Sequence, residues 1–351
     1  MDPHATSIFQ DGLFSVPASL GNLKVIRRGF FIALSDLRYL MPSFDLQGHR
    51  GARGLKPENT LPSFEVALDI GVSTIETDVH LTQDCVPVLI HDSCLNQRVF
   101  QLTPTGNPTI PISKLTLDQL RRNPAIGNPD PARFCRQDPS VTPLAQIYAD
   151  QAGMHPYAVP TVSDLFALLE MYVGDKGLLA GKSDAQRARA RRVCIDLELK
   201  RVPFFPVVIG DDFDGKSWGQ LEPCVLDSIR TANLLDRTRV RSFDHRCVKI
   251  LRRLEPRLAA SVLIAETAPV SPSELARLAD AQTYCPDYRF LDETQVKQCH
   301  ADGIRVVPWT VNELEHWQRL IDWGVDGIIT DDPGRLISML AARGLPLPDR
   351  Y

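Results

Sequence analysis

The feature that most constrains the fold of this chain is a regular alternation of short apolar runs with longer amphipathic stretches, beginning at Phe44. Apolar runs of four to seven residues, rich in β-branched side chains, predict strands, and the stretches between them have the length and spacing of helices. The predicted strands cover residues 44–48, 74–80, 86–91, 193–199, 238–243, 259–264, 282–285, 304–310 and 327–330.

The connections between these strands indicate how the strands pair. Only five residues separate 74–80 from 86–91, whereas a parallel crossover needs a dozen or more, so these two strands should form an antiparallel hairpin. The other eight alternate with helices, which predicts a (β/α)8 TIM barrel whose site lies at the C-terminal ends of its strands. The predicted helices cover residues 60–70, 164–172, 224–235, 245–254, 272–281, 292–301, 313–322 and 334–343.

Two segments depart from this rhythm. Residues 1–43 show no strong period and are predicted to be an N-terminal extension with one possible short helix at 32–40. Residues 92–160 contain ten prolines and one convincing helix, at 113–121, so we expect a subdomain inserted over the barrel mouth after the hairpin. The predicted barrel therefore covers 44–345, with an insertion at about 92–160.

Composition excludes several classes of protein. The net charge of -4 is unlike that of a nucleic-acid-binding protein. The longest run without a polar side chain, 202–210, has nine residues, far fewer than the ~20 of a membrane span. The eight cysteines form no C-x-x-C pair, and no signal peptide is recognised, so we expect free thiols in the cytoplasm. A periplasmic or secreted location would require a different start codon. The sequence does not indicate the oligomeric state.

Three carboxylates are predicted to meet at the barrel rim. Glu76 and Asp78 share one face of their strand, because strand side chains alternate. Two such carboxylates need either a shared proton or a cation between them. Glu198, at the end of the next parallel strand, can complete an oxygen site that suits Mg²⁺ or Ca²⁺ and lacks the His and Cys ligands that zinc prefers.

Charge balance indicates a phosphate ester as the substrate. Three carboxylates and a divalent cation leave -1, and a phosphodiester adds another negative charge. Arg50 and Lys200, which follow the first and third parallel strands, would return the site to neutrality. His49 and His91 also end strands and can face each other across the mouth, where they could divide general-acid and general-base work.

An ordered series of motifs extends these observations. The motifs are Gly48-His49-Arg50-Gly51, Pro57-Glu58-Asn59-Thr60, Glu76-x-Asp78-Val79, Thr82-x-Asp84, Pro87-Val88 with His91-Asp92, Glu198-x-Lys200, Ser242-Phe243, Trp309-Thr310-Val311-Asn312, and Gly324-Val325-Asp326-Gly327 with Thr330-Asp331. In order and spacing this series resembles the glycerophosphodiester phosphodiesterase family. The resemblance runs from Phe44 to about Pro333 and is weak across 93–192.

The resemblance implies a phospholipase C-like barrel that uses a divalent cation to hydrolyse glycerophosphodiesters to sn-glycerol 3-phosphate and an alcohol. The implied roles are the catalytic pair for His49 and His91, the metal ligands for Glu76, Asp78 and Glu198, phosphate contacts for Arg50 and Lys200, and a wall beside the glycerol for Trp309. One departure is Cys85, which stands in the hairpin turn where the family usually has glycine.

Several neighbouring residues are interpreted as supporting groups. We expect His80 not to bind metal, Asp196 to support the carboxylates, Glu58 and Asn59 to hold the loop after His49, and His245 to cap a helix or be exposed. Two other functions remain open: a lysophospholipase D or phospholipase D-type enzyme, for which the apolar residues after Lys200 are candidate lipid contacts, and a catalytically inactive binding barrel. The attacking group is either water or, as we favour, the glycerol 2-hydroxyl, which would give a cyclic phosphate.

Overall fold

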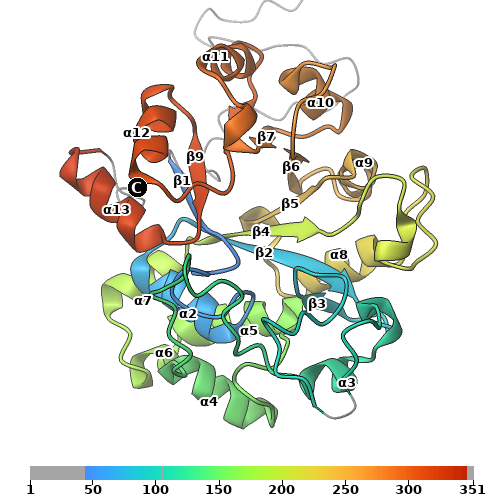
Figure 1. Cartoon of the computed structure of the whole chain (residues 1–351), viewed down its shortest axis with the longest axis vertical. Coiled ribbons are helices and arrows are strands. Elements are labelled where there is room, and N and C mark those ends of the chain that lie inside the picture. The colour runs from blue at the N-terminus through green and yellow to red at the C-terminus, as the bar shows by residue number, and fades with distance from the viewer. Residues whose placement is uncertain (1–43, 104–105, 346–351) are drawn as a thin grey trace, which may run out of the picture. The chain divides into compact units, whose positions relative to one another are not determined.

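The computed structural model describes residues 44–103 and 106–345 (Figure 1). The predicted N-terminal extension and its possible helix lie outside these residues. Within the described part, no helix combines the length and the apolar character needed to cross a membrane. All eight cysteines fall inside it, and none of them is in a disulfide.

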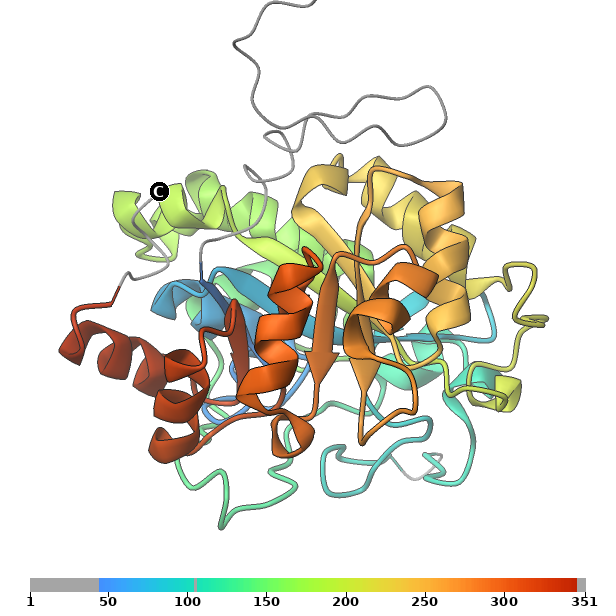
Figure 2. The same ribbon diagram turned by 90° about the horizontal axis from the view of Figure 1, so that it is seen from above.

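Eight parallel strands form a nearly closed barrel, as the alternation predicts (Figures 1 and 2). The strands are β1 (Asp45–Gly48), β2 (Thr74–Leu81), β4 (Cys194–Leu199), β5 (Thr238–Ser242), β6 (Ala259–Ile264), β7 (Thr283–Pro286), β8 (Arg305–Val306) and β9 (Gly327–Thr330). Their order in the sheet is β8-β7-β6-β5-β4-β2-β1-β9. Backbone bonds join β9 to the chain just after β8: Ile329 N donates to Pro308 O at 3.1 Å and Val311 N to Ile329 O at 2.9 Å.

The predicted hairpin is also confirmed. β3 (Pro87–Leu89) pairs antiparallel with the end of β2. Thr82 fixes the turn, because its side chain accepts a hydrogen bond from Val86 N at 2.9 Å. Cys85 has φ +60° in this turn, a left-handed backbone that glycine adopts more easily. The turn therefore forms with Cys85 in place, but in a conformation that disfavours any side chain.

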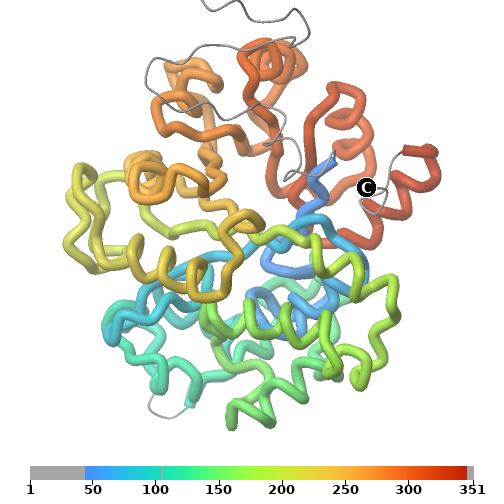
Figure 3. The backbone as a smooth tube through the Cα atoms, turned by 180° about the vertical axis from the view of Figure 1, so that it is seen from behind, coloured from blue at the N-terminus to red at the C-terminus, as the bar shows by residue number. Residues whose placement is uncertain are grey.

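All eight predicted helices are present and pack around the outside of the strands (Figure 3). Local sequence sets several ends: the side chain of Thr60 accepts from Ser63 N before α2, and Gly71 ends that helix with φ +92°. The helices are α2 (Leu61–Ile70), α5 (Val162–Val173), α8 (Leu221–Thr231), α9 (His245–Leu254), α10 (Pro272–Leu278), α11 (Glu293–Ala301), α12 (Leu314–Asp322) and α13 (Pro333–Ala342).

Several predicted boundaries were wrong, and three of them have a clear local reason. β8 has two regular residues instead of seven, because Pro308 has no N–H to donate to a ladder. The chain nevertheless stays extended, with Trp309 N bonded to Pro286 O at 3.0 Å. α8 and α10 end earlier than predicted, since Asn233 (φ +54°) and Asp280 (φ +57°) turn into left-handed backbone just past them.

Between β3 and α5 the structure holds more helix than predicted. The expected helix at 113–121 is split into η1 (Ile112–Lys114) and α3 (Leu117–Arg121), and α4 (Pro143–Ala152) was missed. Pro143 contributed to the proline count that argued against helix, yet it stands in the first turn, where a missing N–H costs nothing. The buried carboxylate of Glu65 accepts from the N–H groups of Leu144 and Ala145 and fixes the start of α4.

The remaining helices, α6 (Asp175–Leu179) and α7 (Asp184–Ala190), lie between α5 and β4. Within α7, Arg187 pairs with Asp184. The segment after β3 also has a small apolar core of its own, separate from that of the barrel. Its buried members are Val88, Ile90, Leu95, Val99, Phe100, Ile112, Leu120, Ala125 and Val159.

Candidate active site

The structure brings Glu76, Asp78 and Glu198 together at the C-terminal ends of β2 and β4. Glu76 and Asp78 point inward from alternate positions of β2, and Glu198 is the register partner of Asp78 on β4. One oxygen from each carboxylate lies within 4.8 Å of the others, and all three residues are buried. Such a group of oxygen donors can hold a hard divalent cation.

Three cationic side chains border these carboxylates. Lys200 Nζ lies 2.6 Å from Glu198 Oε1 and 3.3 Å from Asp78 Oδ1. Arg50 Nε lies 3.2 Å from Asp78 Oδ2, and Arg241 Nη2 lies 2.8 Å from Glu76 Oε1. Sequence reasoning missed Arg241, although its place on β5 beside Glu198 follows from the strand register.

The shifts in pKa indicate the charge states of Asp78 and Lys200. Burial alone would raise the pKa of Asp78, but Lys200 and Arg50 outweigh it and hold that pKa well below its ordinary value. Burial would likewise lower the pKa of Lys200, but Glu198 and Asp78 raise it. Asp78 is therefore ionised and Lys200 protonated at neutral pH.

The loop after β1 is held in place by Glu58 and Asn59. Glu58 receives Arg50 Nη1 at 2.6 Å and lies 2.6 Å from Arg53 Nε. Asn59 Nδ2 donates to Asp78 Oδ2 at 2.9 Å, and its Oδ1 accepts from Thr77 at 2.7 Å. Both side chains therefore position the residues that surround the carboxylates, as the sequence interpretation expects.

His49 is oriented by a carboxylate from the last strand. Its Nδ1 lies 2.6 Å from Asp331 Oδ1, and its Nε2 lies 3.9 Å from Glu76 Oε2. Burial would raise the pKa of Asp331, but His49, Arg53 and Arg133 hold that pKa below its usual range. Because Asp331 is ionised, it accepts a hydrogen bond from Nδ1–H and leaves Nε2 free to exchange a proton in the cavity.

His91 has a similar partner in Asp92, its neighbour in the chain. Nδ1 of His91 lies 2.6 Å from Asp92 Oδ1, while Asn96 donates to the second oxygen at 2.8 Å. The hydrogen bond from His91 is the main cause that lowers the pKa of Asp92 to about 2. Both histidines thus have one ring nitrogen fixed by a carboxylate, an arrangement suited to acid–base work.

The other two histidines considered from the sequence have different contacts. His80 is fully buried, and its Nε2 donates to the backbone carbonyl of His91 at 3.2 Å. Burial lowers the pKa of His80 to about 4, so the ring is neutral at pH 7. The expectation for His245 was wrong: Asp244 caps α9, and half-buried His245 bonds to the carbonyl of Leu263 at 2.9 Å.

A cavity of about 420 Å³ joins these groups at the barrel mouth. His49, His91, Glu76, Glu198 and Lys200 line it together. The cavity is also lined by Arg50, Arg53, Arg133, Arg241, Phe243 and Trp309.

Trp309 forms one wall of this cavity. Its Nε1 donates to the carbonyl of Cys285 at 2.9 Å, and its ring meets Phe243 edge to face with centroids 5.6 Å apart. Arg133 reaches the cavity from the segment between β3 and α5 and lies 3.2 Å from Asp331 Oδ2. Neither Arg133 nor Asp331 was assigned a role from the sequence, because their partners are remote in the chain.

Known proteins are similar to this chain in sequence. The model of the glycerophosphoryl diester phosphodiesterase family matches residues 49–209 and 211–335. A glycerophosphodiester phosphodiesterase of Caldanaerobacter subterraneus subsp. tengcongensis is 26% identical over 297 residues, which are 84% of this chain and 97% of that protein.

Two solved structures have the same fold. A putative glycerophosphoryl diester phosphodiesterase from Silicibacter pomeroyi superposes with a TM-score of 0.71 at 28% identity, covering 89% of this chain and 99% of that one. A phosphodiesterase from Oleispira antarctica, solved with the product sn-glycerol-3-phosphate, gives 0.63 at 20% identity over 87% and 99% of the two chains. With the family model matched along most of its length, this chain belongs to the glycerophosphoryl diester phosphodiesterase family.

Proposed function

We propose that this chain is a metal-dependent glycerophosphodiester phosphodiesterase, which releases sn-glycerol 3-phosphate and an alcohol. Family membership and the names of its relatives support the reaction. The observation that carries the proposal is a cluster of three carboxylates, two of which, Glu76 and Glu198, line the same cavity as two histidines that are each held by a carboxylate of their own. We propose residues 44–345 as the catalytic domain, with the insertion at about 92–160 forming part of its mouth.

The proposed metal ligands are Glu76, Asp78 and Glu198. Their carboxylate oxygens fit Mg²⁺ or Ca²⁺, whereas zinc sites favour His and Cys. A bound divalent cation would polarise the phosphoryl oxygens of the substrate. Arg50 and Lys200 are the proposed phosphate contacts, and Trp309 is the proposed wall beside the glycerol.

The two histidines can exchange the protons that the reaction requires. In the first step, the glycerol 2-hydroxyl gives its proton to His49 as its oxygen bonds to phosphorus. The bond from phosphorus to the alcohol oxygen breaks, and that oxygen takes a proton from His91. We favour this intramolecular attack because effective molarities for well-oriented groups reach ~10⁵ M or more.

The second step restores both histidines. Water gives a proton to His91 as its oxygen bonds to the phosphorus of the cyclic phosphate. The bond to the glycerol 2-oxygen breaks, and that oxygen takes the proton from His49. The net change is one diester and one water converted to sn-glycerol 3-phosphate and an alcohol.

The test is an assay of the purified protein on glycerophosphocholine. We expect sn-glycerol 3-phosphate and choline as products, loss of turnover in EDTA, and recovery with Mg²⁺ or Ca²⁺. Release of phosphocholine and glycerol would contradict the proposed bond cleavage. Full turnover after exhaustive chelation would contradict the metal requirement.

A further inference from the structure

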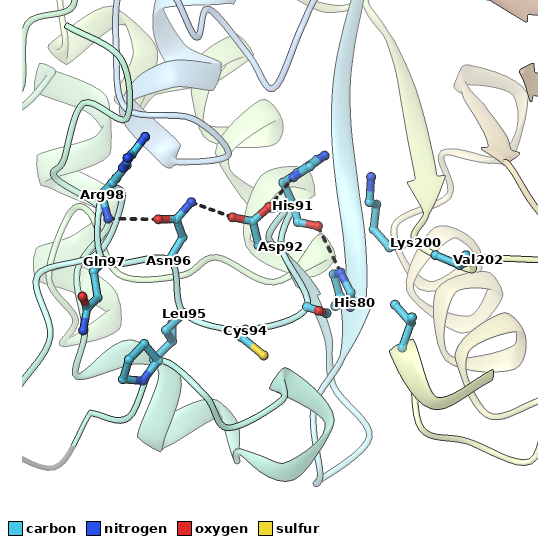
Figure 4. A pocket seen from close by; sticks show the side chains of 13 residues that line it. His80, His91, Asp92, Cys94, Leu95, Asn96, Gln97, Arg98, Lys200 and Val202 are labelled. Atoms are coloured by element: carbon cyan, nitrogen blue, oxygen red, sulfur yellow. Dashed lines mark hydrogen bonds and ion pairs between the residues drawn. The ribbon is translucent and has the colours of Figure 1, made fainter. Parts of the chain in front are cut away.

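The segment between β3 and α5 contacts the carboxylate partner of each histidine. On the His91 side, Asp92 uses one oxygen for His91 Nδ1, at 2.6 Å, and the other for Asn96 Nδ2, at 2.8 Å. Asn96 Oδ1 in turn accepts the backbone N–H of Arg98 at 3.0 Å, which directs the amide donor toward Asp92. Figure 4 shows this row of hydrogen bonds along one wall of a second cavity, which His91 also lines.

On the His49 side the carboxylate is also held at both oxygens. Asp331 Oδ1 lies 2.6 Å from His49 Nδ1, and Asp331 Oδ2 accepts from Arg133 Nη2 at 3.2 Å. Asn312 Nδ2 donates to the same Oδ2 at 2.7 Å. The side chain of Asp331 is 3% exposed and that of Arg133 is 51% exposed, so Arg133 reaches the carboxylate from the solvent side.

The part of the segment that carries Arg133 is anchored at the barrel mouth. Residues 133–140 lie against the loop after β1. Phe134 is buried there, at 3% exposure, with the guanidinium of Arg53 4.7 Å from its ring centroid. Gln137 Nε2 donates to the backbone carbonyls of Arg53 at 2.8 Å and Lys56 at 3.2 Å. The backbone that carries Arg133 is therefore fixed to the loop on which His49 stands.

An aspartate that is bound at both oxygens keeps one orientation. Its terminal torsion is otherwise soft, so a carboxylate bound at one oxygen alone can turn. When the second oxygen is also bound, the first stays opposite the histidine Nδ1, and the orientation of the ring is fixed as well. The effect on a rate can be large, because a misplacement of about 1 Å can cost ~10²-fold.

We propose that Asn96 and Arg133 are positioning residues, each of which fixes a histidine through its carboxylate partner. Asn96 acts on His91, and Arg133 acts on His49. This inference rests on the proposed function, in which the two histidines exchange the protons of the reaction. It gives the segment between β3 and α5 a part in orienting both histidines, and neither residue touches the substrate in this role.

The first test measures the steady-state kinetics of Asn96→Ala and Arg133→Ala on glycerophosphocholine, with Mg²⁺ or Ca²⁺ in excess. We expect kcat to fall by about tenfold in each variant, because a histidine whose partner can turn is misplaced for part of the time. KM should stay within about twofold of the wild-type value, since neither residue touches the substrate. Thermal melts establish that each variant is folded.

Two neighbouring side chains provide matched controls. Gln97 is exposed and adjoins Asn96 in the chain. Arg136 is 57% exposed and lies in the same anchored part as Arg133, but it pairs with Asp332. Gln97→Ala and Arg136→Ala should each keep kcat within about twofold of the wild-type value, as is usual for surface substitutions.

A second test combines each change with the loss of a histidine, because groups that act as one unit are not additive. In the His91→Ala background, Asn96→Ala should cause no further loss of kcat, whereas Arg133→Ala should still cause a loss of about tenfold. The pattern should reverse in the His49→Ala background. A general effect on packing would instead add to the loss in both backgrounds.

Each other outcome contradicts a definite part of the argument. A near-normal kcat in both single variants, or losses that add in both backgrounds, would overturn the inference and leave the proposed function standing. A raised KM at unchanged kcat would make the residue a substrate contact and would also overturn the inference. Loss of kcat in one single variant alone would overturn the assignment of the other residue. Failure of the wild type to hydrolyse glycerophosphocholine would overturn the proposed function and the inference together.

Discussion

The barrel interior contains two groups of buried charges made from the same kinds of residue. The lower group consists of Asp45, Asp196 and Arg239, all at most 3% exposed. Arg239 Nη2 lies 2.7 Å from Asp45 Oδ2 and 2.6 Å from Asp196 Oδ2. Burial would raise the pKa of Asp45, but Arg239 and other partners outweigh it and lower that pKa. These charges cross-link β1, β4 and β5 from inside.

The upper group is the carboxylate cluster of Glu76, Asp78 and Glu198. It differs because it borders the 420 Å³ cavity, which Glu76 and Glu198 line directly. Asp196 and Glu198 stand two residues apart on the same face of β4, yet Asp196 pairs with Arg239 in the lower group. Asp196 also supports the upper group through Arg241, whose Nη1 lies 3.6 Å from Asp196 Oδ2. Access to the cavity, more than residue type, therefore separates a candidate site from a structural ion pair.

The largest predicted effect concerns the two histidines above the upper group. His49→Ala and His91→Ala should each lower kcat by roughly 10²–10⁴-fold, because each removes a proton-transfer group. Steady-state kinetics on glycerophosphocholine measure the loss, and thermal melts should show little change in stability. A near-normal kcat in one variant would show that its histidine is structural. That result would weaken the contrast between the upper group as a candidate site and the lower group as structural ion pairs.

Asp196→Asn tests the lower group. The amide cannot balance Arg239, so a buried cation loses part of its compensation, and we expect a loss of about 3 kcal/mol in the free energy of unfolding. Urea denaturation measures this loss. Glu198→Gln is the matched control on the same strand and should destabilise the protein less. Equal losses in the two variants would remove the distinction between the groups.

Trp309→Ala tests the wall of the upper cavity. Lost stacking area affects bound substrate and transition state alike, so KM should rise roughly five- to tenfold while kcat changes little. The control is Trp218→Ala, because Trp218 is 56% exposed and does not line the cavity. An unchanged KM, or a collapse of the fold, would assign Trp309 to packing.

The smallest predicted effect lies outside both groups, in the hairpin turn. Cys85→Gly should raise the free energy of unfolding by about 1 kcal/mol, because glycine adopts φ +60° without the penalty of a side chain. Chemical denaturation at fixed pH checks this shift, with kcat on glycerophosphocholine as the companion measurement. Destabilisation instead would mean that the Cys85 contact with Gln220 outweighs the backbone strain.

The barrel could be predicted from the sequence because strands, helix ends and connection lengths each leave a pattern in a short stretch of chain. Apolar periodicity marked the strands, Thr60 and Gly71 bounded a helix, and five residues were too few for a crossover. The errors in the prediction also had local causes. Pro308 shortens β8, and Pro143, which was counted against helix, stands in the first turn of α4. Prolines disfavour regular structure on average, but their effect depends on which backbone N–H the element needs.

The site was predictable only in part. Alternation along one strand and the adjacency of the next parallel strand predict that Glu76, Asp78 and Glu198 lie together, and the register of β2 and β4 places Asp78 opposite Glu198. The partners of His49 could not be found in this way, since Asp331 is 282 positions away in the chain. Arg133 approaches the same carboxylate from the segment between β3 and α5, across 198 positions, and no period in the sequence connects them.

The central claim, that the upper group binds the catalytic cation and the lower group does not, can be tested directly by calorimetry. Mg²⁺ and Ca²⁺ would be titrated into the chelated wild type, Glu198→Gln and Asp196→Asn, each at a temperature where its melt shows it to be folded. We predict one binding site in the wild type, affinity at least tenfold weaker in Glu198→Gln, and near-normal affinity in Asp196→Asn. Unchanged affinity in Glu198→Gln would contradict the account.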